Sequence, residues 1–258
     1  MTFTLEHLEF YLLILMRVSG FIMTAPFFSY SSVPQRIRAA MSVFMSLVVI
    51  QVTPVVDLTY SGVFGYSALV LKESMIGVVL GLMCSMCFYI INLAGQLMDM
   101  EMGLSMANMF DPMVNMQFSV TGSLYNYLLM LMLVVTNMHY YIIRAIVDSF
   151  FYFNVGKAVF DTVSLKNIVV DFIANYFIIA VRIVLPVFCC MLLINVVLGV
   201  LAKAAPQMNM FVVGMQIKVL AGLAVLVIVI QSFPMVSDYI FGEMKDVITQ
   251  VIHLFTPK

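Results

Sequence analysis

Long apolar runs separated by short polar links constrain this chain more than any single motif does. They cover roughly Leu8–Ser29, Ala39–Val56, Gly65–Met98, Gly122–Val147, Phe172–Leu201 and Phe211–Val236. Each run is long enough for an α-helix to cross the ~30 Å hydrocarbon core of a bilayer. Since a segment in lipid must satisfy its own backbone polar groups, we predict an all-α integral membrane protein with about six long apolar helices.

Composition supports this class and excludes others. Hydrophobic residues make up 64% of the chain, charged residues 10%, and the mean hydropathy is +1.10, so polar surface is too scarce to cover a soluble globule. A net charge of −1 without a basic stripe gives no electrostatic footprint for nucleic acid. Glu6 and Glu9 stand before the first apolar run in place of a basic region, so we expect a retained helix and no signal peptide.

The links and the tail define the organisation of the chain. A basic link carries Arg36 and Arg38, a Met-rich acidic link covers residues 99–118, and the tail at residues 237–258 alternates charged and apolar residues. No internal repeat or flexible linker separates these parts, so we predict one domain over residues 1–258 with an amphipathic C-terminal tail. The third run would form a straight helix roughly 50 Å long, which is too long for a simple upright span.

Several charged residues lie inside the apolar runs. They are Arg17, Lys72, Glu73, Arg182 and Lys218. A lone charge there costs about 2.5–3.5 kcal/mol on the insertion scale, so these side chains should be buried against protein or face water. Pairing between helices is one explanation, and direct transport chemistry is another. A proton relay usually recruits several carboxylates or histidines, and only Glu73 lies deep in a run, which weakens the transport interpretation.

Helix-packing signals accompany these charges. Gly77 and Gly81 form a GxxxG pattern, which lets another backbone approach closely. Prolines inside or at the ends of the runs predict kinks or helix ends, namely Pro26, Pro54, Pro186 and Pro234. Kinked helices suit a curved assembly, although ordinary transporters also contain them.

Residues suited to catalysis or metal binding are sparse. Cys84 and Cys87 form a CxxC without further zinc ligands nearby, and we interpret all four cysteines as small buried hydrophobes. Ser19 lacks the Gly-x-Ser-Gly context of an intramembrane protease, and His139 has no evident connection to it. We therefore predict no catalytic site, no metal and no cofactor. An intramembrane enzyme would need a nucleophile among Ser19, Cys84 and Cys87.

Two patterned polar segments stand out against the apolar background. One is Pro206-Gln207-Met208-Asn209-Met210-Phe211, between the last two runs. The other is the Met-rich link. At its start, Gly95, Asp99 and Gly103 follow one another at four-residue spacing, and Asp111-Pro112 lies further along it. Methionine is soft and unbranched, so this link could re-pack around different surfaces. With 24 methionines in the chain, Met could equally be a general substitute for Leu and Ile.

Both segments resemble the signature of the FliR/SctT family, the integral-membrane subunits of flagellar and injectisome protein-export gates. The resemblance extends to Arg17, Pro26, Glu73 and the segment Val33-Pro34-Gln35-Arg36-Ile37-Arg38. It implies a non-enzymatic component of the flagellar export gate, at the basal body in the bacterial inner membrane. It also implies that the helices pack into a hetero-oligomeric helical assembly. An injectisome subunit and a stand-alone secondary transporter or channel are the alternatives.

The resemblance further implies partners and site residues. The partners are FliP-like and FliQ-like subunits, FlhB-like and FlhA-like proteins, unfolded export substrates and membrane lipid, with no nucleic acid. A pore plug is implied at Gly103, Met106, Met109, Phe110, Asp111, Pro112, Met113 and Met116. A subunit interface is expected at Pro206, Gln207, Asn209, Phe211, Gly214 and Lys218. Asn and Gln there could bridge backbone groups of neighbouring helices.

Overall fold

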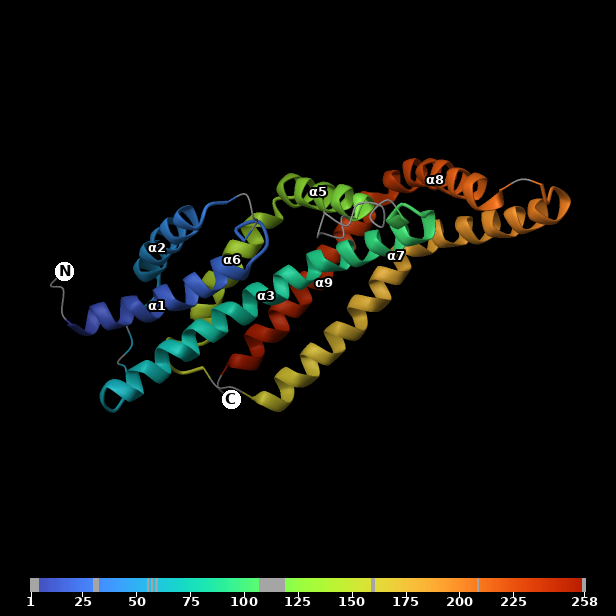
Figure 1. Ribbon diagram of the computed structural model, residues 1–258. Coiled ribbons are helices and arrows are strands. Elements are labelled where there is room, and N and C mark those ends of the chain that lie inside the picture. The colour runs from blue at the N-terminus through green and yellow to red at the C-terminus, as the bar shows by residue number, and fades with distance from the viewer. Residues whose placement is uncertain are drawn as a thin grey trace. The chain divides into compact units, whose positions relative to one another are not determined.

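The computed structural model describes residues 5–29, 33–54, 56, 58, 60–106, 119–158, 161–207 and 209–256. Within these ranges every regular element is a helix, which confirms the predicted all-α class (Figure 1). The elements are α1 (Leu5–Thr24), α2 (Gln35–Val52), α3 (Gly62–Met102), α5 (Val120–Val135), α6 (Met138–Tyr152), α7 (Thr162–Ala204), α8 (Met210–Val229), the 3₁₀-helix η1 (Ile230–Ser232) and α9 (Phe233–Phe255).

The helices have the length and composition of membrane spans. Five helical stretches of the described chain are long and apolar enough to cross a bilayer, and a sixth is added if α5 and α6 count as one broken span. The break falls inside the predicted run Gly122–Val147, at Thr136 and Asn137. Asn137 adopts φ 57°, a left-handed conformation that asparagine tolerates. These two polar residues are the sequence signal that run length alone overlooks.

Two helices are much longer than a bilayer requires. α3 has 41 residues and α7 has 43, which corresponds to about 62 Å and about 65 Å at 1.5 Å per residue. Such lengths exceed the ~30 Å hydrocarbon core, as the third apolar run predicts for α3. Pro186 lies inside α7 without ending it, whereas α1 and α2 end shortly before Pro26 and Pro54.

Internal contacts divide the chain into two compact units. Unit 1 comprises Met1–Cys87, Leu133–Phe172 and Phe241–Lys258, and unit 2 comprises Phe88–Met132 and Ile173–Ile240. The boundaries fall within α3, α5, α7 and α9. The prediction of one domain over the whole chain stays a prediction.

Unit 1 has a well-filled apolar core. In Figure 1, α1 lies alongside the first part of α3, and Phe10, Leu13 and Phe21 of α1 are buried. The C-terminal part of α9 is amphipathic, with charged and polar residues on its exposed side. Its apolar side, which includes Ile248 and Val251, is buried within unit 1. This helix therefore uses its apolar face for packing inside the protein.

Unit 2 has a smaller core and leaves much apolar surface of α7 and α8 uncovered. Tyr125 of α5 stacks on Phe233 with ring centroids 5.2 Å apart, and Met98 and Leu129 lie in the same unit's core. Outside this core, large apolar side chains of α7 and α8 are exposed. Over an 18-residue apolar stretch of each span, the chain buries 28% in α7 and 17% in the span that begins in α8, compared with 56% in α3. In unit 1, α2 is as uncovered, with 17% buried.

Candidate functional site

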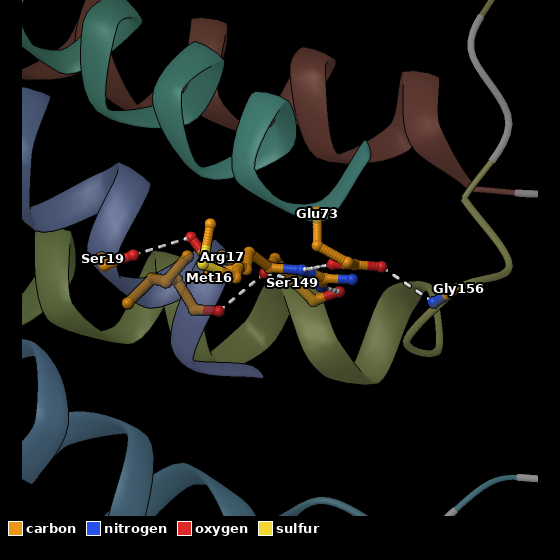
Figure 2. A network of polar contacts seen from close by, with 7 residues as sticks. Met16, Arg17, Ser19, Glu73, Ser149 and Gly156 are labelled. Carbon is orange, nitrogen blue, oxygen red and sulfur yellow. Dashed lines mark hydrogen bonds and ion pairs between the residues drawn. The ribbon is translucent and has the colours of Figure 1, made fainter. Parts of the chain in front are cut away.

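A buried ion pair lies inside unit 1. Arg17 in α1 and Glu73 in α3 are both 0% exposed, and Arg17 Nε lies 2.5 Å from Glu73 Oε2 (Figure 2). Mutual attraction offsets the loss of hydration of two buried charges only if the geometry is close and the remaining polar atoms find partners. The structure thus pairs two of the charges that the sequence places inside apolar runs.

Further hydrogen bonds extend this pair to two other segments. Arg17 Nη1 donates to the carbonyl oxygen and to Oγ of Ser149 in α6, at 3.3 Å each. Glu73 Oε1 accepts the backbone N–H of Gly156 at 2.8 Å, in the turn after α6 (Figure 2). Gly156 has φ +81°, a conformation that glycine adopts at little cost. The network therefore joins α1, α3, α6 and the connection from α6 to α7.

Two aromatic rings cover the guanidinium group. Arg17 Cζ lies 4.1 Å from the ring centroid of Phe150 and 4.5 Å from that of Phe153. Away from water, such cation–π contacts contribute on the order of 2 kcal/mol. Lysine lacks the flat, forked cation that can stack on a ring and hydrogen-bond in the ring plane, so this geometry favours arginine.

Three glycines let α1 and α3 approach closely enough to form the pair. A Cβ atom added to Gly77 would collide with the backbone carbonyl of Arg17, and one added to Gly81 would also collide with α1. On the facing helix, a Cβ atom at Gly20 would lie 2.7 Å from the carbonyl oxygen of Ser74. The GxxxG pattern lies at this contact, and Gly20 is the part that sequence reasoning missed.

In unit 2, the Asp99 carboxylate ties together the two ends of the Met-rich link. Only 4% exposed, Asp99 accepts hydrogen bonds from Ser119 Oγ at 2.7 Å and from Thr121 Oγ1 at 2.5 Å. The backbone N–H of Thr121 donates to the same carboxylate at 3.2 Å. Ser119 Oγ also accepts the N–H of Gly122 at 2.9 Å, as an N-cap of α5. We call Asp99, Ser119 and Thr121 the Asp99 clasp.

The surroundings of the Asp99 clasp explain the four-residue spacing in the sequence. A Cβ atom added to Gly95 would overlap the backbone of Gly122, so α3 and α5 touch beside the clasp. One turn beyond Asp99, Gly103 adopts φ +80°, and its N–H donates to the carbonyl of Met100 at 3.2 Å. Such a left-handed glycine ends a helix. Gly95, Asp99 and Gly103 thus provide, in order, a close contact, a carboxylate and a helix end.

A hollow of about 320 Å³ lies at this end of α3, within unit 2. Its lining includes Gly103 and Met106, which belong to the predicted plug, and Gly214 and Lys218, which belong to the predicted interface. Asn195 of α7 also lines it. The structure therefore brings together residues that two separate motifs contributed.

The other predicted site residues lie outside these two networks. Pro206, Gln207 and Asn209 are exposed in the single chain, and Lys72 is half-buried. In contrast to its predicted burial, Arg182 is exposed on α7 within this chain. The predicted plug residues Met109, Phe110, Asp111, Pro112, Met113 and Met116, and the side chain of Phe211, lie outside the described residues.

The candidate nucleophiles serve helix packing. Ser19 Oγ donates to the carbonyl oxygen of Met16 in its own helix, at 3.1 Å. Cys84 and Cys87 are fully buried in α3, whereas Cys189 is exposed, unlike the prediction that all cysteines are buried. In the part of the chain that the structure describes, no group of three His, Cys, Asp or Glu side chains could hold a metal ion.

Sequence reasoning missed the uncharged partners of both networks. Ser149 lies 132 positions from Arg17, and a serine in an apolar helix carries no pattern that would connect the two. Gly156 is equally inconspicuous in the sequence. A signal was available for Ser119, because a serine just before an apolar run is a typical N-cap.

Known proteins similar to this chain form a consistent group. The family model described as bacterial export proteins, family 1, matches residues 8–244. A relative from Aquifex aeolicus (strain VF5) is 30% identical over 93% of this chain and 92% of its own length. Relatives from Bacillus subtilis (strain 168) and Escherichia coli (strain K12) are 28% and 26% identical, over 90% and 96% of this chain and 90% and 94% of their own lengths.

All three relatives are named flagellar biosynthetic protein FliR. The match to the family model covers nearly the whole chain, including both networks described above. This chain therefore belongs to the bacterial export proteins of family 1.

Proposed function

We propose that this chain is a non-enzymatic component of the flagellar type III export gate, at the basal body in the bacterial inner membrane. Its family and the FliR names of its relatives support a role in flagellar protein export. Its apolar spans support a position in the membrane. In this proposal the chain lines part of a channel for unfolded proteins, together with FliP-like and FliQ-like subunits, and FlhB-like and FlhA-like proteins act with it.

The uncovered apolar surface of α7 and α8 carries the proposed partnership. α7 is roughly 65 Å long, and lipid hydrocarbon covers only ~30 Å of a helix. Most of its apolar span is not buried by the rest of the chain. Apolar surface left in water is unfavourable, so the part of the helix beyond the lipid needs other protein around it. Neighbouring subunits of a helical assembly would supply that cover.

Co-purification tests this partnership. The chain is expressed with the FliP-like and FliQ-like proteins of the same bacterium and extracted in mild detergent. We expect a stable complex that contains all three proteins, and a less stable chain when it is purified alone in detergent. A monodisperse chain without partners that transports a solute into liposomes would contradict the export-gate function and support the stand-alone transporter.

The exposed connection between α7 and α8 offers a second test of the same partnership. The side chains of Gln207 and Asn209 make no hydrogen bond with the residues that the structure describes, and both residues are exposed. A hydrogen bond between membrane helices is worth about 0.6–2 kcal/mol. Gln207→Ala combined with Asn209→Ala should therefore lower the yield of the complex and swimming motility. Wild-type yield and motility would rule out an interface at this connection.

We propose further that the Met-rich link is the pore plug. A channel wide enough for an unfolded chain would leak ions when idle, and soft methionine side chains suit a seal that must yield and re-form. The Asp99 clasp supports this role because it holds the residues that precede and follow the link. If the link moves when a substrate passes, the Asp99 clasp would hold its two ends in place.

A deletion tests the plug. Removal of Met106 to Met116 should permit assembly and raise the leakage of small ions across the membrane. Conductance is compared with that of wild-type cells that contain the same amount of complex. An assembled deletion variant without added leakage would show that the link has no sealing role.

The two branches of the family are distinguished in the bacterium that encodes this chain. Loss of the chain should abolish flagellar assembly and motility if it serves the flagellum. If motility persists while secretion through an injectisome stops, the chain belongs to that machine. The FliR names of its relatives favour the first outcome.

A further inference from the structure

One side of α7 in unit 2 carries a continuous row of exposed side chains. We call the row the α7 stripe; it consists of Ile178, Arg182, Leu185, Cys189, Leu193 and Val196. Their spacing of three and four residues places them on one side of the helix. The opposite side, which includes Ala180, Val187 and Met191, is buried in unit 2. One side of this part of α7 is thus buried within the chain, and the other side is exposed.

Arg182 gives the α7 stripe a charge in an apolar surrounding. It is the only charged residue from Phe172 to Ala202 and lies roughly 30 Å from either end of α7. No ion pair joins it to any acidic residue that the structure describes. The neighbouring stripe residues Ile178 and Leu185 are 49% and 45% exposed. The stripe therefore presents one cation between large apolar side chains.

Neither lipid nor water alone suits this surface. Hydrocarbon would cover Ile178 and Leu185 well, but it disfavours the charge of Arg182. Water would solvate Arg182 but leave the apolar side chains on both sides of it exposed. In addition, the segment from Phe172 to Ala202 is roughly 46 Å long, more than the ~30 Å hydrocarbon core. A surface that is apolar and carries one negative charge satisfies all of these requirements.

We propose that the α7 stripe binds an apolar helix of another subunit, and that this helix places a carboxylate opposite Arg182. A guanidinium group binds a carboxylate through two parallel hydrogen bonds, and this pairing fixes the register of the two helices. The inference rests on the proposed partnership in the export gate. It adds the surface through which a partner binds and the charge that the partner must carry.

Three substitutions at one position test this surface. Arg182→Glu reverses the charge, Arg182→Leu removes it in a form that lipid accepts, and Arg182→Lys retains it. The measured quantity is the amount of FliP-like and FliQ-like subunits recovered per chain from the membrane. We expect a loss of ~10-fold or more for Arg182→Glu and a several-fold loss for Arg182→Leu. Arg182→Lys should give a smaller loss than Arg182→Leu, because it retains the charge but not the two parallel hydrogen bonds. An acidic residue of the partner changed to lysine should restore binding to Arg182→Glu.

Matched controls separate this inference from others. Arg144→Glu reverses the charge of an exposed arginine on α6, which pairs with Asp148 of the same helix, and should leave partner recovery unchanged. Wild-type recovery with Arg182→Leu would show that lipid covers the stripe and would overturn the inference. If the Arg182→Glu chain does not accumulate in the membrane, the partner recovery of Arg182→Leu alone tests the inference. A wild-type chain that recovers no partner would instead contradict the proposed function itself.

Discussion

Two arginines in apolar helices, one in each unit, differ in burial and in pairing. Arg17 in unit 1 is fully enclosed, paired with Glu73 and stacked against Phe150 and Phe153. Arg182 in unit 2 is exposed, with no acidic partner among the residues that the structure describes. The charge of Arg17 is therefore paired within the chain, although its Nη2 atom has no hydrogen-bond partner among the described residues. Under the proposed partnership, the charge of Arg182 is paired by another subunit.

Three glycines illustrate the difference between an enclosed and an uncovered helix surface. Gly77 and Gly81 press against α1 so closely that neither has room for a side chain. At Gly199 in α7, an added Cβ atom would meet nothing within 4 Å. Gly77 and Gly81 therefore lie at a tight helix contact, whereas Gly199 lies on a part of α7 that its own chain leaves uncovered.

The largest expected effect comes from opening the buried pair. Glu73→Ala leaves the guanidinium group of Arg17 buried without its counter-charge, which costs about 3–5 kcal/mol. We expect the chain to disappear from the membrane fraction or to lose most of its thermal stability in detergent. Immunoblots of membranes and melting curves of the purified chain measure both.

A double substitution sharpens this test. When Arg17→Leu and Glu73→Leu are combined, no charge remains buried, and apolar replacements of an ion pair are often neutral. The double variant should therefore be more stable than Glu73→Ala. If Glu73→Ala alone is as stable as wild type, the pair does not hold unit 1 together.

Crowding the contact between α1 and α3 should have the next largest effect. Gly77→Ala places a methyl group against the backbone of Arg17, and overpacking of this kind costs about 1–3 kcal/mol. Gly242→Ala in α9 is the matched control, because an added Cβ atom meets nothing within 4 Å there. Melting temperatures should fall for the first variant and stay level or rise slightly for the second. If Gly77→Ala melts at the same temperature as the control variant, the close contact between α1 and α3 does not contribute to stability.

The Asp99 clasp should show a smaller and more local effect. Asp99→Ala leaves Ser119 Oγ and the Thr121 groups without their buried acceptor, at a cost of about 1–3 kcal/mol. We expect faster proteolytic cleavage between residues 103 and 119 and added ion leakage from the assembled complex. Asp99→Asn retains one acceptor oxygen, so its cleavage rate and ion leakage should lie between those of the wild type and those of Asp99→Ala. Unchanged cleavage and leakage would separate the clasp from the proposed plug.

The smallest effect is expected at Arg182 in the isolated chain. An exposed side chain without partners changes stability by no more than about 0.5 kcal/mol when replaced. Arg182→Leu should therefore leave the melting temperature of the purified chain unchanged, in contrast to Glu73→Ala. A drop comparable to that of Glu73→Ala would mean that Arg182 already has a partner within its own chain, and the comparison between the two arginines would fail.

The fold class follows from the sequence because lipid admits few solutions. Long apolar runs must become helices, and α1, α2, α3 and α7 appear where the runs lie. Positions where a run breaks depend on one or two residues, such as Thr136 and Asn137, and were missed. The amphipathic pattern of α9 also left open whether its apolar side covers lipid or protein, since both remove it from water in the same way.

The candidate site was only half predictable. Buried charges such as Arg17 and Glu73 stand out in an apolar sequence because each one is unfavourable there. Their uncharged partners do not, because Ser149 and Gly156 lie far along the chain and resemble other small residues of these helices. The exposure of Arg182 could not be predicted either. The cost of an unpaired charge in an apolar helix requires a partner or water, but it does not say whether the partner lies in the same chain or in another subunit.

Photo-cross-linking at Leu193 tests the central claim most directly. Leu193 lies on the α7 stripe and is 69% exposed, so a photoreactive amino acid fits there without disturbing the chain. In cells that contain all export-gate subunits, illumination should join the chain to a FliP-like or FliQ-like protein. The adduct should be absent in cells that lack the genes of those partners. Complete assemblies that yield no protein adduct at this position would contradict the claim that a neighbouring subunit completes unit 2.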